Sequence, residues 1–81
     1  MVSQPYTKTA RELGAVLALA QGNHAQRHRV MKKARERMAI LEKMNPLFNS
    51  RTFATMVAQF AFPHDAKRHP ALISELLKAK I

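Results

Sequence analysis

The chain has 81 residues, of which 14 are Lys or Arg and 5 are Asp or Glu, so its formal net charge at pH 7 is +9. A charge of this size attracts polyanions, of which nucleic acid is the commonest. The hydrophobic content of 47% is too high for a basic disordered tail, so residues 1–81 are predicted to form one folded domain. Because the chain has no Cys, disulfides and thiolate metal sites are excluded, and a second copy is the expected source of extra stability.

The longest apolar run, residues 13–20, is shorter than the roughly 20 residues that a membrane-spanning helix needs. Polar residues precede it, and no basic segment of a signal peptide is present. The sequence therefore predicts a cytoplasmic, or more broadly intracellular, location. The nucleoid and the nucleus fit the same charge.

The first predicted helix begins within residues 3–10, where Pro5 suits the first helical turn. Gly22 is placed to end this helix, because glycine adopts the left-handed conformation that follows many helices. Asn23 is a typical capping residue for the helix that comes next. The sequence therefore predicts a helical hairpin with its turn at residues 22–23.

The second predicted helix covers residues 24–44 and is the most basic part of the chain. It stops before Pro46, because the residue that precedes a proline is pushed out of the α region. Seven of the 14 Lys and Arg residues lie between Arg27 and Lys43. An apolar stripe at helical spacing gives this helix an inner side and leaves most of the bases outside. The stripe contains Met31, Ala34, Met38 and Leu41.

Two shorter helices are predicted after the proline turn. The third lies within residues 49–61, with Asn49 or Ser50 as its cap. Residues 64–69 are expected to form a polar connector, and the fourth helix is predicted over residues 70–80 with a proline as its first residue. No segment alternates with the two-residue period of a strand. The expected fold class is therefore all-α, a small four-helix domain.

The first predicted helix also indicates a dimer. Its residues 15–20 are apolar on nearly every side, whereas a helix on the surface of a four-helix monomer shows a polar face. We therefore expect a homodimeric helical bundle in which this helix, alone or with the second, lies between two protomers. The residues expected in the core or the dimer contact are Leu13, Val16, Leu17, Met31, Met38 and Leu41.

The ladder of Arg29, Lys33 and Arg37 on the second predicted helix is the main functional signal. Like charges four residues apart repel by about 0.2–0.5 kcal/mol per pair in an isolated helix, so local stability does not explain the ladder. The alternatives are a solvated face, whose long side chains cover apolar surface, and an anionic partner that neutralises the charge.

Contacts to phosphates need only Lys and Arg on a rigid platform, whereas base reading needs side chains set for base edges. The sequence therefore predicts binding to the backbone of duplex RNA or DNA, in a regulatory or accessory role. The predicted contact residues are Arg27, Arg29, Lys32, Lys33, Arg35, Arg37, Lys43, Arg51, Lys67 and Arg68.

Two other kinds of partner fit the same helix. An inhibitor or adaptor would dock on an acidic protein through this basic, Met-rich surface, because Met side chains adapt to varied partners. An anionic membrane surface also suits a basic amphipathic helix, but the absence of aromatic residues on its apolar side disfavours this partner. In size and charge the chain is similar to small basic accessory proteins of viruses and phages, with which it shares no motif.

The other candidate sites give weaker functional signals. His24 and His28 lie four residues apart, as paired metal ligands do, but no third ligand is near, so no metal is expected. Tyr6 and Phe48 are the aromatic candidates for stacking on unpaired bases. The sequence has no Gly-rich phosphate loop, no activated nucleophile and no paired carboxylates. Neither a cofactor nor an enzymatic activity is therefore expected.

Overall fold

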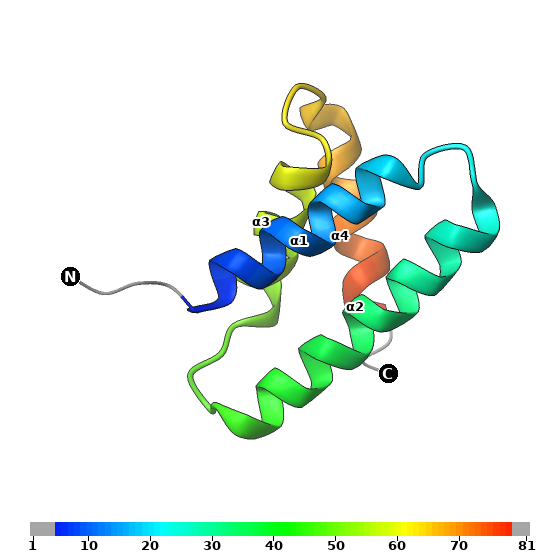
Figure 1. The fold of residues 1–81 in the computed structure, drawn as a ribbon. Coiled ribbons are helices and arrows are strands. Elements are labelled where there is room, and N and C mark those ends of the chain that lie inside the picture. The colour runs from blue at the N-terminus through cyan, green and yellow to red at the C-terminus, as the bar shows by residue number, and fades with distance from the viewer. Residues whose placement is uncertain (1–4, 79–81) are drawn as a thin grey trace.

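Four α-helices and one short 3-10 helix make up the described part of the chain, residues 5–78 of a computed structural model (Figure 1). The helices are α1 (Pro5–Leu19), α2 (His24–Met44), α3 (Ser50–Ala61) and α4 (His69–Leu77), and the 3-10 helix η1 covers Ala66–Arg68. Residues 5–78 contain no strand. The predicted all-α class with four helices is therefore confirmed.

Local capping sets the boundaries of the two middle helices. Gly22 has a φ of 83°, in the left-handed region that favours glycine, and it ends the turn after α1. The side-chain oxygen of Asn23 accepts a hydrogen bond from the amide of Gln26 at 3.0 Å, and Asn49 accepts one from the amide of Thr52 at the same distance. Both predicted caps, and the turn at residues 22–23, are confirmed.

Helices α1 and α3 approach each other closely at Gly14. A Cβ atom at this position would lie 2.5 Å from the Cβ of Phe60, 2.9 Å from the amide nitrogen of Ala61 and 2.9 Å from the carbonyl oxygen of Val57. Only a hydrogen atom fits there. Figure 1 shows the result, with α1 crossing directly over α3.

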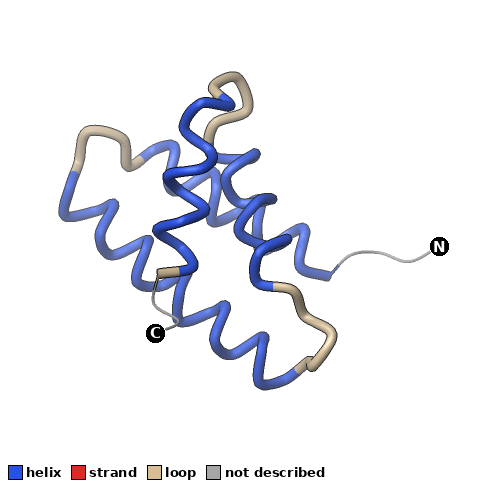
Figure 2. Tube along the Cα trace, turned by 180° about the vertical axis from the view of Figure 1, so that it is seen from behind, coloured by secondary structure: helices blue, strands red, loops and turns tan. Residues whose placement is uncertain are grey.

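Helix α3 is the most buried helix and contacts both α1 and α4. Helix α2 closes the structure through fewer contacts with α1 and α4, and Figure 2 shows it from behind as a long diagonal helix beside α4. Its inner stripe meets the side chains of the other three helices in one core. The core residues are Ala10, Leu17, Val30, Met31, Ala34, Met38, Phe53, Ala54, Val57, Ala58, Ala61, Leu72 and Leu76.

Five of the six residues predicted for the core or the dimer contact lie in or against the core of the single chain. Leu17, Met31 and Met38 are buried within the single chain, and Leu13 and Leu41 are half-buried against the same core.

Val16 is 38% exposed, so it does not belong to the core of the single chain, and its predicted place in a dimer contact stays a prediction. It lies beyond the edge of the face that α1 buries, and Ala15 and Leu19 on the outer side of α1 are exposed as well. One side of α1 is therefore buried within the single chain. The dimer stays a prediction, and it concerns the other, exposed side of α1.

The carboxyl-terminal region differs from the prediction in two details. The segment predicted as a polar connector contains η1, and α4 begins at His69, one residue before Pro70. The ring nitrogen Nε2 of His69 lies 2.7 Å from the carbonyl oxygen of Phe62, which ties the start of α4 to the end of α3. Helix α4 ends at Leu77, where the next amide bonds three residues back instead of four, whereas the predicted end near Lys80 lies outside the described residues.

The replacement Gly14→Ala is expected to destabilise the protein by about 1–3 kcal/mol, because the added methyl group overlaps α3. In an unhindered helix the same change would stabilise by roughly 1 kcal/mol. Urea unfolding followed by circular dichroism measures the difference. Ala15→Gly, at the exposed neighbouring position, calibrates the propensity effect. A Gly14→Ala variant as stable as its parent would contradict the close crossing of α1 and α3.

Candidate nucleic-acid interface

Helix α2 presents its bases to solvent because its inner stripe fixes its orientation. Met31, Ala34 and Met38 are buried, and residues on the opposite side of a helix must then face outward. We call the outward basic residues of this helix the α2 basic face. It consists of Arg29, Lys32, Lys33, Arg37 and Lys43, all exposed.

The predicted ladder of Arg29, Lys33 and Arg37 lies on this face. Successive members are about 6 Å apart along the helix axis, from a rise of about 1.5 Å per residue. Within residues 5–78, the three side chains form no ion pair with any acidic residue. The ladder therefore carries like charges that form no ion pair within the described chain.

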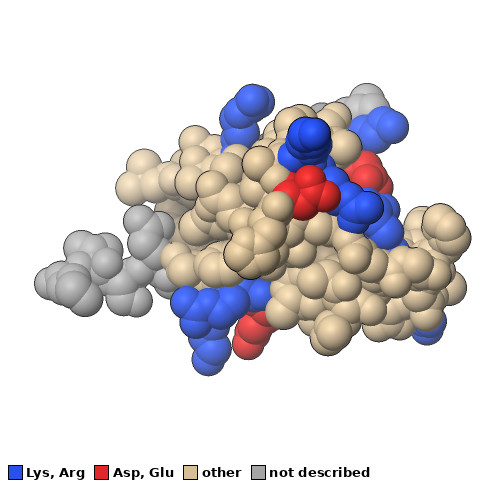
Figure 3. All heavy atoms as spheres, turned by 90° about the horizontal axis from the view of Figure 1, so that it is seen from above, with Lys and Arg blue, Asp and Glu red and all other residues tan. Residues whose placement is uncertain are grey.

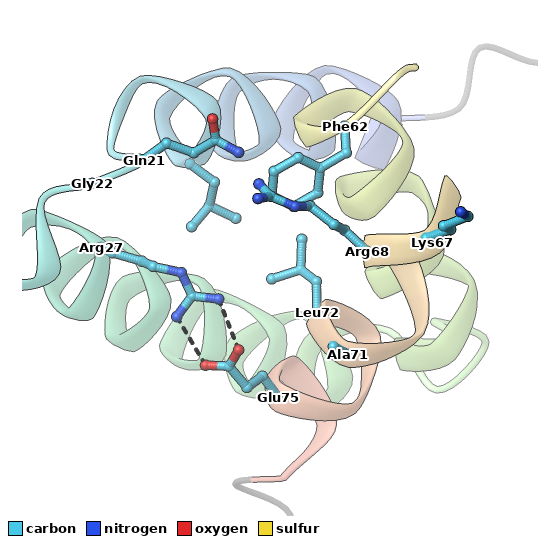
Figure 4. A pocket seen from close by; sticks show the side chains of 10 residues that line it. Gln21, Gly22, Arg27, Phe62, Lys67, Arg68, Ala71, Leu72 and Glu75 are labelled. Atoms are coloured by element: carbon cyan, nitrogen blue, oxygen red, sulfur yellow. Dashed lines mark hydrogen bonds and ion pairs between the residues drawn. The ribbon is translucent and has the colours of Figure 1, made fainter. Parts of the chain in front are cut away.

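Arg27, predicted as a phosphate contact, is instead committed to Glu75 of α4. Its Nη2 lies 2.7 Å from Oε1, and its Nη1 donates to Oε2 at 3.0 Å, a bidentate ion pair that Figure 4 shows with dashed lines. The hydrogen bonds between these side chains raise the pKa of Arg27 and lower the pKa of Glu75, against the opposing effect of partial burial. Arg27 thus joins α2 to α4.

Arg68 is also held by the protein itself. Its Nε lies 3.3 Å from Oδ2 of Asp65, and its guanidinium carbon lies 5.1 Å from the centre of the Phe62 ring. Figure 3 looks down on this end of the molecule, where basic and acidic side chains lie side by side. The positive charge here is partly balanced, unlike that of the α2 basic face.

The remaining predicted contacts are spread over the molecule. Arg35 is half-buried on α2, and its charge contributes to lowering the pKa of Glu75. Lys67 is exposed and shares a pocket with Arg27 and Arg68. Arg51 is exposed at the start of α3. The structure therefore brings five of the ten predicted contacts together on one helix face.

The two aromatic stacking candidates pack against the core. The rings of Tyr6 and Phe48 lie 5.0 Å apart in an edge-to-face contact, and Phe48 lies 5.5 Å from Phe53. The side-chain amide of Asn45 donates a hydrogen bond to the Tyr6 hydroxyl. These contacts give both rings a structural role at the end of α2.

The sequence reasoning missed an apolar surface at the carboxyl end of α2. Met44 is 76% exposed and Leu47 is 89% exposed, and Ile40 is exposed one turn before Met44. A signal was present, because Ile40 and Met44 are four residues apart and lie off the predicted inner stripe. The α2 basic face is thus continued by an apolar end.

Residues 5–78 contain neither a cluster of metal ligands nor a helix suited to span a membrane. No group of three or more His, Asp or Glu side chains is arranged to hold a metal ion, and His24 and His28 lie exposed in the first turns of α2. None of the described helices has both the length and the apolar character needed to cross a bilayer.

The replacement Glu75→Gln is expected to lower the free energy of unfolding at pH 7 by about 0.5–1 kcal/mol, a modest value because the pair is partly exposed. The folded-state pKa of Glu75 lies below its ordinary value of 4.5. The contribution of the pair is therefore fully present above 4.5 and is lost as the pH falls through the lower folded value.

Urea unfolding of parent and variant over a pH series measures this difference, which should vanish in acid. Glu12→Gln is the matched control, since this exposed carboxylate of α1 has no ion pair within residues 5–78. A Glu75→Gln effect that stayed constant into acid would show that the charge of the carboxylate is not its source.

Comparison of the chain with known proteins adds no relative to this description. It matches no protein-family model, no curated protein and no solved structure. Function is therefore inferred from the residues of this chain alone.

Proposed function

We propose that this protein binds the phosphate backbone of nucleic acid through the α2 basic face. The observation that carries the proposal is the exposed ladder of Arg29, Lys33 and Arg37, which lacks acidic partners in the described chain. Phosphates would relieve its internal repulsion and release condensed counterions on binding.

A duplex is the form of nucleic acid that this surface favours. Helix α2 has 21 residues, and a straight helix of that length extends about 30 Å. Binding to single strands commonly uses aromatic rings as stacking platforms, whereas Tyr6 and Phe48 pack against the core. A rod of cations suits the closely spaced phosphates of a double helix. The role of the protein in the cell would be regulatory or accessory.

The proposed active form is a homodimer. The outer side of α1 carries Ala15, Val16 and Leu19, with Leu19 86% exposed. Pairing of this side with a second copy would bury apolar surface and present two basic faces to one duplex. Leu17, by contrast, already belongs to the core of the single chain.

The apolar end of α2 favours a second candidate function, docking on an acidic protein. Ile40, Met44 and Leu47 would anchor a partner whose acidic residues contact the neighbouring bases. Apolar anchors add nothing to a contact with phosphates, so the two functions differ in their dependence on Met44.

The triple replacement of Arg29, Lys33 and Arg37 by Ala is expected to weaken binding to duplex DNA and to duplex RNA, whatever their sequences. Loss of three phosphate contacts per protomer should reduce the slope of log affinity against log salt on B-DNA by about 2.7 for a bound monomer and by about 5.4 for the proposed dimer. Fluorescence anisotropy with labelled duplexes between roughly 50 and 200 mM salt measures both effects.

The matched control replaces Lys8, Arg11 and Lys78 by Ala, which removes the same charge from exposed positions outside α2. It should retain nearly all of the affinity. Equal losses in the two variants would contradict a defined interface on α2. If neither duplex bound the parent protein at low salt, the proposal would be wrong, and Met44→Asp would then test docking on acidic proteins captured from a lysate.

For the dimer, Leu19→Asp is expected to convert a dimeric parent into a folded monomer, because it places a charge in the apolar contact. Light scattering after size exclusion measures the mass, and circular dichroism measures the helix content. Leu47→Asp is the control, since Leu47 is 89% exposed but lies on the loop after α2. A monomeric parent protein would refute this arrangement.

A further inference from the structure

A pocket of about 690 Å³ lies between the α1–α2 turn and the start of α4 (Figure 4). Pockets that hold small molecules commonly measure about 300–1,000 Å³. None of the ladder residues lines this pocket, so it is separate from the interface proposed above. Its walls combine an apolar floor with basic side chains, which is the usual composition of a site for an organic anion.

Arg68 is the donor that this pocket offers to a ligand. The Phe62 ring supports one face of its guanidinium group, and Asp65 engages its Nε. Within residues 5–78 its two terminal nitrogens have no acceptor, and Figure 4 shows the group reaching over the pocket from the α4 side. A guanidinium group held in this way is prepared to receive a carboxylate through two parallel hydrogen bonds.

The other basic side chains limit the charge that the ligand can carry. Arg27 forms the opposite wall, but its bidentate pair with Glu75 already neutralises it. In Figure 4 the side chain of Lys67 points away from the centre of the pocket. The Arg68 guanidinium group, whose charge Asp65 already partly balances, suits a monoanion better than a phosphate dianion, which would require a second cation.

The apolar floor of the pocket determines the chemical character of the rest of the ligand. Leu17 and Leu72 line the floor of the pocket, where each exposes only a small part of its surface (4% and 2%), and the amide of Gln21 lies at the rim. A flat apolar group attached to the carboxylate would cover this floor. We propose that the pocket binds a small monocarboxylate with a planar apolar body, such as an aryl carboxylate.

Benzoate is the probe for this site, and amide and guanidinium NMR spectra of the labelled full chain are the measurement. We expect saturable shifts at Gln21, Gly22, Leu72 and the Arg68 Nε, with a dissociation constant of about 1 mM for a ligand this small. Benzyl alcohol, which lacks the carboxylate, and acetate, which lacks the ring, should bind much more weakly.

Arg68→Gln should weaken benzoate binding at least about tenfold, since it removes a charge-assisted pair of hydrogen bonds. Arg51→Gln, an exposed arginine outside the pocket, is the matched control and should change little. Ala71→Glu gives a second test, because it adds a repelling carboxylate at an exposed position of the pocket wall without disturbing the core.

Unchanged binding in both pocket variants would overturn the proposal, as would shifts confined to the α2 basic face. The triple alanine variant of the ladder should bind benzoate like its parent. This result separates the two sites. Failure of nucleic-acid binding would leave the benzoate shifts intact, and failure of benzoate binding would leave nucleic-acid binding intact.

Discussion

The contact of α1 with α3 at Gly14 is the constraint on which the rest of the structure depends. Because no side chain separates the two backbones there, α1 buries its inner face on α3 and leaves its outer side uncovered. Helix α4 occupies another part of the α3 surface. Helix α2 then receives only a narrow strip of contacts, and most of its circumference remains in solvent.

The local features of the fold were predictable because they depend on neighbouring residues. Gly22 and Asn23 specify the first turn through backbone conformation and capping, and the 3-4 spacing from Met31 to Met38 specifies which side of α2 is buried. Contacts between distant segments were not predictable in this way. The pair of Arg27 with Glu75, 48 residues apart, and the exposure of Val16 both follow from how the helices cross.

The cations of this protein divide according to what the fold supplies around them. Arg27 and Arg68 lie where two segments converge, so each finds a carboxylate, and Arg68 also finds an aromatic ring. Within residues 5–78, the bases on the outside of α2 form no ion pair with a second segment. The sequence shows the spacing of these bases but does not show which arginines are already occupied, and for this reason the predicted interface contained members of both groups.

The ladder of Arg29, Lys33 and Arg37 links the behaviour of the protein to ionic strength in two opposite ways. Salt screens the interaction between charges that lie more than about 8–10 Å apart, and it also weakens the interaction between exposed neighbouring charges. Added salt therefore relieves the repulsion within α2 and favours the folded helix. The same salt removes the gain in counterion entropy on which the proposed complex with nucleic acid depends. The solution conditions that best preserve the free protein are therefore those in which its proposed ligand dissociates.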